Sequence, residues 1–373
     1  MLRCMYSGIS GMKVNQQKLD VIGNNIANVG TTAFKSSRAA FTDMLYQNAG
    51  TASAPTSNKG GTNAKQVGLG AKLASIDRIM SQGNALSTGR SLDACIDGEG
   101  FFIVGNGMIN YENGGTTLDA DMGISGGDMS INYTRDGNFQ LDYEGNLVTA
   151  DGYRVMGYLL TAKTYDKDGN EITDGVPESA AASIDKDGVA QYVDADGVVK
   201  AASNSILQPL RIPDTVHVPE YTTTDKAGNQ TTVAASDQKV QSFTIGKDGM
   251  IIATLANGKK SALGQIAMAS FKNPAGLTAK GGNLYEVSPN SGEALVRTPI
   301  NVDKDEKGDP IQDQNLDNSK GFGDVIQSCL EASNVDLTEQ FTDMITATRS
   351  FQAASKMITT GDEILQTITG LMR

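Results

Sequence analysis

Residues able to carry out chemistry are few and scattered in this chain. His217 is the only histidine among 373 residues, and it lies between two valines in a segment flanked by prolines. A general base needs an oriented nucleophile within hydrogen-bond reach, and no arrangement of Ser, His and Asp of that kind can be read from the sequence. We therefore interpret His217 as a surface or packing residue, and we predict no catalytic residues and no enzyme.

Two acidic segments resemble calcium-binding loops in composition. They are YDKDGNE at residues 165–171 and DADG at residues 194–197. An EF-hand loop needs glycine at its sixth position and an acidic ligand at its twelfth, whereas Gly169 is only the fourth residue counted from Asp166. We interpret both segments as hairpin turns and predict no metal site, with a calcium site as the alternative.

Glycine-rich and cysteine motifs give no cofactor site. GLGAKL and GEGFFIV lack the third glycine of the dinucleotide-binding fingerprint, and neither opens a βαβ unit, so we expect no cofactor. Cys4, Cys95 and Cys329 are far apart and form neither a disulfide framework nor a metal-ligand spacing. Cys95 lies in an apolar, strand-like run and is expected to be buried.

Charge and composition exclude other classes of partner. The net charge of −12, from 31 basic and 43 acidic residues, argues against nucleic acid as a partner. No segment approaches the roughly 18 apolar residues of a membrane span, and the N-terminal segment lacks the apolar core of a cleaved signal peptide. The 42 glycines, the absence of tryptophan and the aromatic content of 6% indicate a turn-rich, β-rich structural protein.

Both ends of the chain carry helical apolar patterns. Apolar residues at steps of three and four predict an N-terminal amphipathic helix that stops near Asn28 and Gly30: Leu2, Met5, Ile9, Met12, Leu19, Ile22 and Ile26. A row with a spacing of seven predicts a C-terminal helix: Leu337, Met344, Phe351, Ile358, Leu365 and Met372. Asp336 and Glu339 resemble a capping box, so we place the start of this helix near Val335 and its end almost at Arg373.

The terminal helices need a partner, because burying six large apolar side chains contributes about 9–18 kcal/mol whereas ordering the C-terminal segment costs roughly 40–70 kcal/mol of conformational entropy. The two seams allow pairing with each other in a monomeric stalk or contacts with neighbouring copies, and the heptad pattern leaves both open. Their polar faces carry Gln, Thr, Asp and Asn rather than Lys and Arg, which argues against membrane insertion.

Between the helices the pattern changes to short strands and turns. Asp-Gly or Asn-Gly pairs predict hairpin turns at Asp97, Asp136, Asp151, Asp168, Asp174, Asp187, Asp196, Asp248 and Asn257, beside strand-like runs such as FFIV, NFQLD, GMIIATL and QIAMASF. Residues 46–70 are polar and glycine-rich and predict an extended connector. Residues 163–242 are rich in Asp, Ala, Thr and Gly and predict an inserted outer domain.

Several long segments, in the same order, resemble bacterial flagellar rod and hook proteins over nearly the whole chain. Residues 7–41 (SGISGMKVNQQKLDVIGNNIANVGTTAFKSSRAAF) resemble the N-terminal signature of that family, and residues 333–368 (SNVDLTEQFTDMITATRSFQAASKMITTGDEILQTI) resemble its C-terminal signature. Residues 66–104, 133–158, 263–277 and 281–294 resemble its inner β domain, including the segments LDACIDGEGFFIV and YTRDGNFQLD.

The resemblance implies an α+β fold with mainly β inner and outer domains and long N- and C-terminal α-helices that form a coiled-coil-like helical domain. The expected domains are a terminal helical (axial core) domain at 1–34 and 335–373, an extended connector at 35–70, an inner β domain at 71–160 and 243–334, and an inserted outer β domain at 161–242. The residues expected at the junction of helix and connector are Asn24, Asn25, Asn28, Thr31, Thr32 and Phe34, with the asparagines capping backbone groups and Phe34 anchoring the turn by burial.

The function that the resemblance implies is a structural subunit of the flagellar hook. Many copies would assemble into a curved, flexible tube that transmits motor torque to the filament as a universal joint, through a repeated non-closing contact. The expected partners are other copies of the chain, the distal rod, hook cap and hook–filament junction proteins, and the flagellar type III export apparatus. The expected location is the hook at the cell surface, reached without a cleaved signal peptide.

Two alternatives stay open at the level of sequence. Within the family, a distal rod subunit of the basal body resembles this chain at both ends, although such proteins usually lack so large an insert. Outside the family, a secreted β-rich protein would bind calcium or another ligand through residues 163–242.

Overall fold

The computed structural model describes residues 2–55, 59–108, 111, 115–119, 122–127, 129–162, 183–185, 188–195, 199–201, 205–218, 221–224, 230–233, 235–297 and 323–371. The chain divides into two compact units, which we call the terminal unit, residues 1–81 with 333–373, and the central unit, residues 82–332. The structure is mostly β with one long helix near each terminus, as expected from the sequence.

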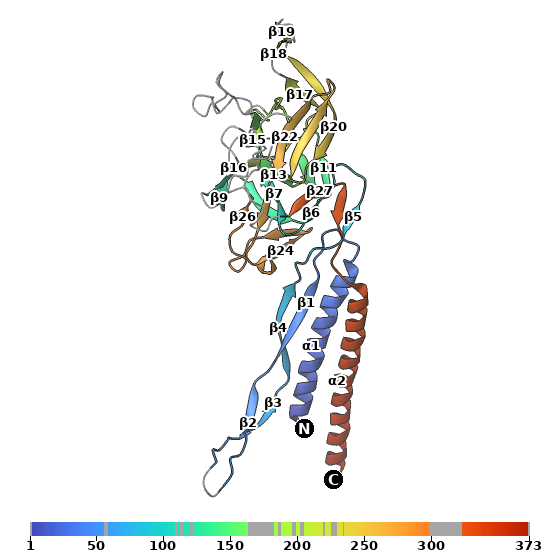
Figure 1. The fold of residues 1–373 in the computed structure, drawn as a ribbon. Coiled ribbons are helices and arrows are strands. Elements are labelled where there is room, and N and C mark those ends of the chain that lie inside the picture. Colours follow the sequence, from blue (N-terminus) through green and yellow to red (C-terminus); the bar gives the residue numbers. More distant parts are fainter. Residues whose placement is uncertain are drawn as a thin grey trace. The chain divides into compact units, whose positions relative to one another are not determined.

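The terminal unit contains both helices (Figure 1). Helix α1 spans Leu2–Ala27 and α2 spans Leu337–Leu371, and the two run side by side in opposite directions. The predicted stop of the first helix is confirmed. Asp336 Oδ1 accepts hydrogen bonds from the backbone N–H groups of Thr338 and Glu339, at 2.8 and 3.4 Å, so it is the N-cap of α2. Neither helix described here is long and apolar enough to cross a membrane.

Four strands complete the terminal unit. Strand β1 (Ser37–Asp43) pairs antiparallel with β4 (Ala71–Arg78), and β2 (Tyr46–Gly50) pairs antiparallel with β3 (Lys65–Gly68). The predicted connector at 35–70 is therefore largely a two-stranded ribbon, because backbone hydrogen bonds form a ladder even where side chains are polar. Strand β4 lies in this unit, although the sequence placed its residues in the inner β domain.

The central unit holds sixteen described strands in one sheet, whose main path runs β17-β20-β21-β22-β13-β7-β10-β25-β24. The elements of the central unit are β5 (Ala85–Ser87), β6 (Ala94–Asp97), β7 (Phe101–Gly107), β8 (Thr116–Leu118), β9 (Ile124–Gly127), β10 (Met129–Thr134), β11 (Phe139–Leu141), β12 (Leu147–Thr149), β13 (Arg154–Tyr158), β14 (Leu160–Ala162), β15 (Val199–Ala201), β16 (Ile206–Pro209), β17 (Thr215–Val218), β18 (Tyr221–Thr224), β19 (Gln230–Val233), β20 (Ser236–Ile245), β21 (Met250–Leu255), β22 (Lys260–Ile266), β23 (Met268–Ser270), the 3-10 turn η1 (Pro274–Gly276), β24 (Thr278–Gly281), β25 (Leu284–Glu286), β26 (Leu295–Val296), β27 (Asp324–Gln327) and β28 (Cys329–Glu331).

The core of the central unit is built from the predicted strand-like runs. The FFIV run forms the first part of β7 and is buried over all four residues. Phe102 contacts Phe139 edge to face, with ring centroids 5.1 Å apart. The runs GMIIATL and QIAMASF form β21 and the end of β22 with β23, so these predictions are confirmed.

The hairpin predictions hold at some Asp-Gly and Asn-Gly pairs and fail at others. Those at Asp151, Asp248 and Asn257 join strands that pair directly, and each is followed by a glycine with positive φ. Those at Asp97 and Asp136 are wrong, because β6 pairs with β27 and β10 pairs with β7 and β25. Those at Asp168, Asp174, Asp187 and Asp196 lie outside the described residues.

The glycine after Asp136 serves close packing rather than a hairpin. A Cβ at this residue, Gly137, would lie 1.6 Å from the carbonyl oxygen of Ala94. Only glycine lets the two backbones approach in this way.

The expected outer insert is continuous with the inner sheet where it is described. Strands β16 and β17 belong to the same sheet as β7 and β13. Strand β20 spans the expected boundary at residue 242, and its ladder with β21 shifts register between Val240 and Ser242. In this part of the chain the described strands share one sheet with the inner strands, and a separate outer domain stays a prediction.

Candidate assembly surface

The two helices of the terminal unit pack through small residues. A Cβ on Gly8 would lie 3.3 Å from Ile358, and one on Gly361 would lie 3.3 Å from Met5. Gly11 faces Ala354 in the same antiparallel register, at 3.9 Å. Glycine and alanine at successive turns therefore let the helix backbones approach closely.

The predicted seam residues of α2 lie on the side toward α1. Met344, Phe351, Ile358 and Leu365 are each partly buried, and the neighbouring row contains the buried Ala347 and Gly361. Leu337 at the helix start is 40% exposed. The side chains of Leu2 and Met372 lie outside the described set. The coiled-coil geometry expected of this helix pair stays a prediction.

On α1 the predicted seam residues differ in burial. Ile22 is 3% exposed, Met5, Met12, Leu19 and Ile26 are partly buried, and Ile9 is exposed. The sequence missed Val14, which is buried although it lies off the predicted stripe. Helix α1 lies between α2 and the strands (Figure 1), so it has two packed faces, which a one-stripe pattern cannot represent.

Asn25 ties the end of α1 to the first strand. Its side chain donates to the carbonyl of Ser37 at 2.8 Å and accepts from the Ser37 backbone N–H at 3.0 Å. The same amide donates to Gln340 of α2 at 3.0 Å. Asn25 is 1% exposed, so its loss would leave buried polar groups without partners.

The other predicted junction residues lie near Asn25 but have different surroundings. Asn28 donates to the backbone and side chain of Asn24, and Thr31 donates to Asn28. Phe34 is partly buried, and its role in anchoring the turn stays a prediction. Thr32 is also partly buried.

Two junction residues were missed by sequence reasoning. Lys35 is 2% exposed and donates from Nζ to the carbonyl of Ser81 at 2.8 Å. Asn334 accepts from the Ser36 N–H at 2.7 Å and donates to the carbonyl of Ile79 at 2.8 Å. A lysine that satisfies backbone carbonyls gives no spacing signal, because its partners are far away in sequence.

A groove on the terminal unit lies between α1 and the strands. It has a volume of about 620 Å³ and is lined mainly by apolar side chains: Tyr6, Ile9, Ser10, Lys13, Val14, Gln17, Met44, Leu69, Ala71, Lys72 and Leu73. Gly70 lies between the lining residues Leu69 and Ala71, with φ at +116° and a position where a Cβ would lie 2.0 Å from a serine Oγ of α1. This is a site where backbone geometry and close approach both require glycine.

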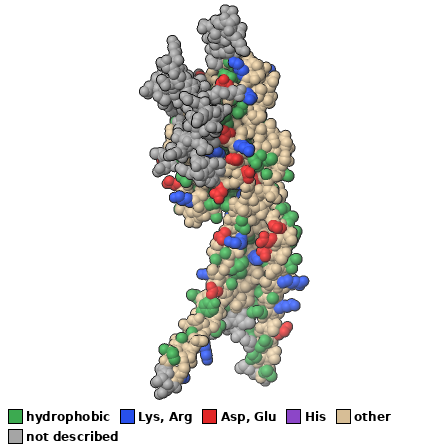
Figure 2. Space-filling view, viewed as in Figure 1, with side chains coloured by type: hydrophobic (Ala, Val, Ile, Leu, Met, Phe, Trp, Pro, Cys, Tyr) green, Lys and Arg blue, Asp and Glu red, His purple; other side chains and the backbone are tan. Residues whose placement is uncertain are grey.

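Large apolar side chains are exposed along the outer faces of the terminal unit, and Figure 2 shows them over its helices and strands. We call the exposed set on α2 the outer stripe: Phe341, Ile345, Met357, Ile364, Ile368 and Leu371. On α1 and the strands the exposed set is Tyr6, Ile9, Phe41, Met44, Leu45, Tyr46, Val67, Ile76 and Ile79. At 100° per residue, Met357, Ile364, Ile368 and Leu371 share one side of α2, whereas Phe341 and Ile345 lie on another. Exposed apolar side chains that share a side in this way mark an interaction site.

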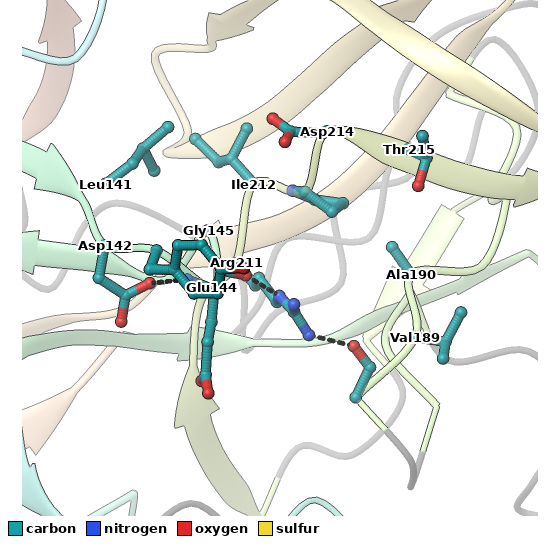
Figure 3. Close-up of a pocket in the computed structure, with 13 residues that line it drawn as sticks. Leu141, Asp142, Glu144, Gly145, Val189, Ala190, Arg211, Ile212, Asp214 and Thr215 are labelled. Carbon is teal, nitrogen blue, oxygen red and sulfur yellow. Dashed lines mark hydrogen bonds between the residues drawn. The ribbon is translucent and has the colours of Figure 1, made fainter.

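A pocket in the central unit is lined in part by charged side chains. It has a volume of about 490 Å³ and contains Arg211 between two loops (Figure 3). The Arg211 guanidinium donates to the carbonyls of Glu144 and Gly188, which connects the two loops and uses two of its five N–H donors. Asp142 accepts from the side chain of Asn146 and from backbone N–H groups. The pocket is thus braced by structural hydrogen bonds.

The single histidine and the acidic segments show no catalytic or metal-binding geometry where they are described. His217 Nδ1 lies 2.7 Å from Asp237 Oδ1 on neighbouring strands, and both side chains are exposed. Residues 165–171 lie outside the described residues, as do Asp196 and Gly197. Among the residues that are described, no cluster of three or more His, Cys, Asp or Glu side chains could hold a metal ion.

Comparison with known proteins places these features in a known class. Family descriptions match at residues 5–35 (flagella basal body rod protein), 95–201 (flagellar hook protein FlgE/F/G D1 domain) and 326–371 (flagellar basal body rod FlgEFG protein C-terminal). The class is that of structural proteins of the flagellum.

Curated relatives define the family. The chain is 38% identical to the flagellar basal-body rod protein FlgG of Bacillus subtilis over 373 residues, covering all of both chains. It is 29% identical to the flagellar hook protein FlgE of Borreliella burgdorferi over an alignment of 481 residues that also covers both chains. It is 28% identical to the flagellar basal-body rod protein FlgG of the same organism, over an alignment of 374 residues that again covers both chains. The chain belongs to the flagellar rod and hook protein family.

Proposed function

We propose that this chain is a subunit of the flagellar hook that assembles with other copies of itself into a curved, flexible helical tube. The observation that carries the proposal is the outer stripe of α2. The inner seam of α2 already packs on α1, and the stripe residues Met357, Ile364, Ile368 and Leu371 form a second apolar side of this helix that is exposed in the monomer. Long exposed apolar faces of this kind are covered in an assembly.

The magnitude of burial favours a lattice over a simple dimer. The four stripe residues in the second half of α2 are Met357, Ile364, Ile368 and Leu371. Because they are 40–82% exposed in the monomer, their burial contributes about 3–6 kcal/mol, whereas association costs about 4–15 kcal/mol in lost freedom. One such contact alone is marginal. Several simultaneous contacts in a helical array give a stable polymer, and a repeated heterologous contact builds that array.

The seam and junction residues have distinct roles in this proposal. The seam pairs the helices within a subunit and so presents the outer stripe, while Asn25 and its neighbours hold the strands against that pair. The weakly apolar surface expected of residues 161–242 suits sliding contacts during bending. In this role the hook transmits motor torque as a universal joint, with the distal rod, hook cap and hook–filament junction proteins as neighbours and the type III apparatus as its export route.

A distal rod subunit is the second candidate. The 38% identity to a rod protein FlgG over the full length of both chains favours it, since the hook proteins align at lower identity. The inserted region between the two inner β segments favours the hook instead.

Electron microscopy of the purified full chain under polymerising salt tests the proposal and separates its two forms. Curved tubes that change curvature are expected for a hook subunit, whereas straight, stiff tubes would assign the chain to the rod. Monomers that persist at high protein concentration, with both helices formed, would contradict self-assembly itself.

A further inference from the structure

Two of the three cysteines meet where the central unit begins and ends. Strand β6 near its start pairs with β27 near its end, with Cys95 opposite Ile326. The chain then turns at Ser328, whose φ is +63° and whose N–H donates to the Asp93 carbonyl at 2.7 Å. Strand β28, which starts at Cys329, next pairs with β5. This turn places residue 329 beside β6.

The two cysteines lie on neighbouring segments of backbone. Strand β28 contacts β6, Cys329 is among the groups that raise the pKa of Cys95, and both are free thiols in the structure. Cys95 is 1% exposed, whereas Cys329 is partly exposed. Disulfide formation requires two side chains that approach from neighbouring backbones, and the contact of β28 with β6 brings these two backbones together.

We propose that Cys95 and Cys329 form a disulfide that fastens the first strands of the central unit to its last strands. The oxidant is a low-molecular-weight disulfide such as glutathione disulfide. The accessible Cys329 thiolate attacks one of its sulfurs, forms a mixed disulfide and releases one glutathione thiolate. Cys95 then loses its proton, attacks the Cys329 sulfur and releases the second. The protein gives up two protons and two electrons, and one disulfide is reduced to two thiols.

The bond would close almost the whole central unit into one covalent loop. A loop from residue 95 to residue 329 restricts the unfolded chain strongly, because loop-closure entropy grows with loop length. The bond would also resist separation of β6 from β27 and of β5 from β28 under a pull on both ends of the unit. This inference concerns the folded subunit and does not depend on the proposed function.

The test uses the full-length chain carrying Cys4→Ser, so that only the proposed pair remains. The folded protein is incubated with glutathione disulfide, and free thiols, intact mass and proteolytic peptides are measured. We expect both thiols to be lost, the mass to fall by that of two hydrogens, and one peptide pair to join the segments of Cys95 and Cys329. The melting temperature should rise by roughly 5–10 °C and return on reduction.

Matched variants and an unfolded control make the test decisive. Cys4→Ser/Cys95→Ala should stop at a glutathione adduct on Cys329 with no rise in melting temperature. The same incubation in denaturant should give the crosslink much more slowly. A persistent adduct on Cys329 when Cys95 is present, crosslinks between two chains, or equal crosslinking of folded and unfolded protein would each overturn the proposal.

Discussion

Replacing Glu331 by Gln should destabilise the central unit strongly. Arg135 Nε donates to Glu331 Oε2 at 2.8 Å, and the two side chains are 4% and 1% exposed. Glu331 Oε1 also accepts from the backbone N–H of Gly83 at 2.8 Å. Glutamine keeps the shape and one acceptor, but its NH₂ group would face the Arg135 donors, and the arginine charge would lose its counter-ion.

The expected loss is about 3 kcal/mol in the free energy of unfolding. Breaking a buried ion pair by removing one partner costs about 3–5 kcal/mol. At an effective dielectric constant of 20, opposite charges about 4 Å apart attract by about 4 kcal/mol, which agrees with that range. Arg135 retains hydrogen bonds to the carbonyls of Gly98 and Gly100, so the lower end applies.

Urea denaturation followed by the near-ultraviolet circular dichroism of the tyrosines is the assay, because the chain lacks tryptophan. Glu286→Gln is the matched control. Its partner Lys280 lies 3.8 Å away and both side chains are about half exposed, so a change within about 1 kcal/mol is expected. If both substitutions shift the midpoint equally little, the buried pair does not hold the ends of the central unit together.

Three further predictions concern the thiol pair and the terminal unit. Burial raises the pKa of Cys95 from 9.0 to about 11, with smaller contributions from the nearby Cys329 and two carboxylates. The unfolded chain therefore loses this proton first, and the free energy of unfolding should fall as pH rises above about 9. Between pH of about 9 and 10, the urea midpoint of the reduced Cys95→Ala variant should fall less than that of the reduced unsubstituted chain. Gly70→Ala should lower the free energy of unfolding by more than about 2 kcal/mol, as followed by far-ultraviolet circular dichroism. Gly258→Ala, at φ +79° with no atoms within 4 Å of the new Cβ, should lower it by about 1 kcal/mol. Gly361→Leu should force the helices apart and lower the melting temperature of the helical signal. Gly370→Leu meets no neighbour and should leave this melting temperature unchanged or raise it. Equal melting temperatures for the two variants would contradict the close helix packing.

The sequence predicted those elements whose side chains repeat with a clear period. The spacing of seven in the C-terminal segment identified the side of α2 that faces α1, because one face of a helix repeats in the same way whatever its partner is. The apolar runs identified β7 and β21 for a similar reason. The two-faced packing of α1 escaped prediction, since Val14 lies off the predicted stripe and lines the groove between α1 and the strands.

Long-range polar contacts could not be predicted from the sequence. Arg135 and Glu331 each lie in a segment that a family description matches, yet nothing local shows that these segments meet in a buried ion pair. Lys35 and Asn334 bond to backbone carbonyls brought near by folding. The same limit applies to Cys95 and Cys329, whose spacing carries no pattern until β6 and β28 come together.

The most direct test of the account is polymerisation of an outer-stripe variant of the full chain. Ile364→Asp/Ile368→Asp places two charges on the exposed apolar face of α2, while Thr359→Asp/Gln366→Asp places two on exposed polar positions of the same helix. We predict that both proteins fold with equal helicity, but that under polymerising salt only the second forms tubes visible by electron microscopy. Tubes from the first variant at the same protein concentration as the unsubstituted chain would contradict the claim that this face drives assembly.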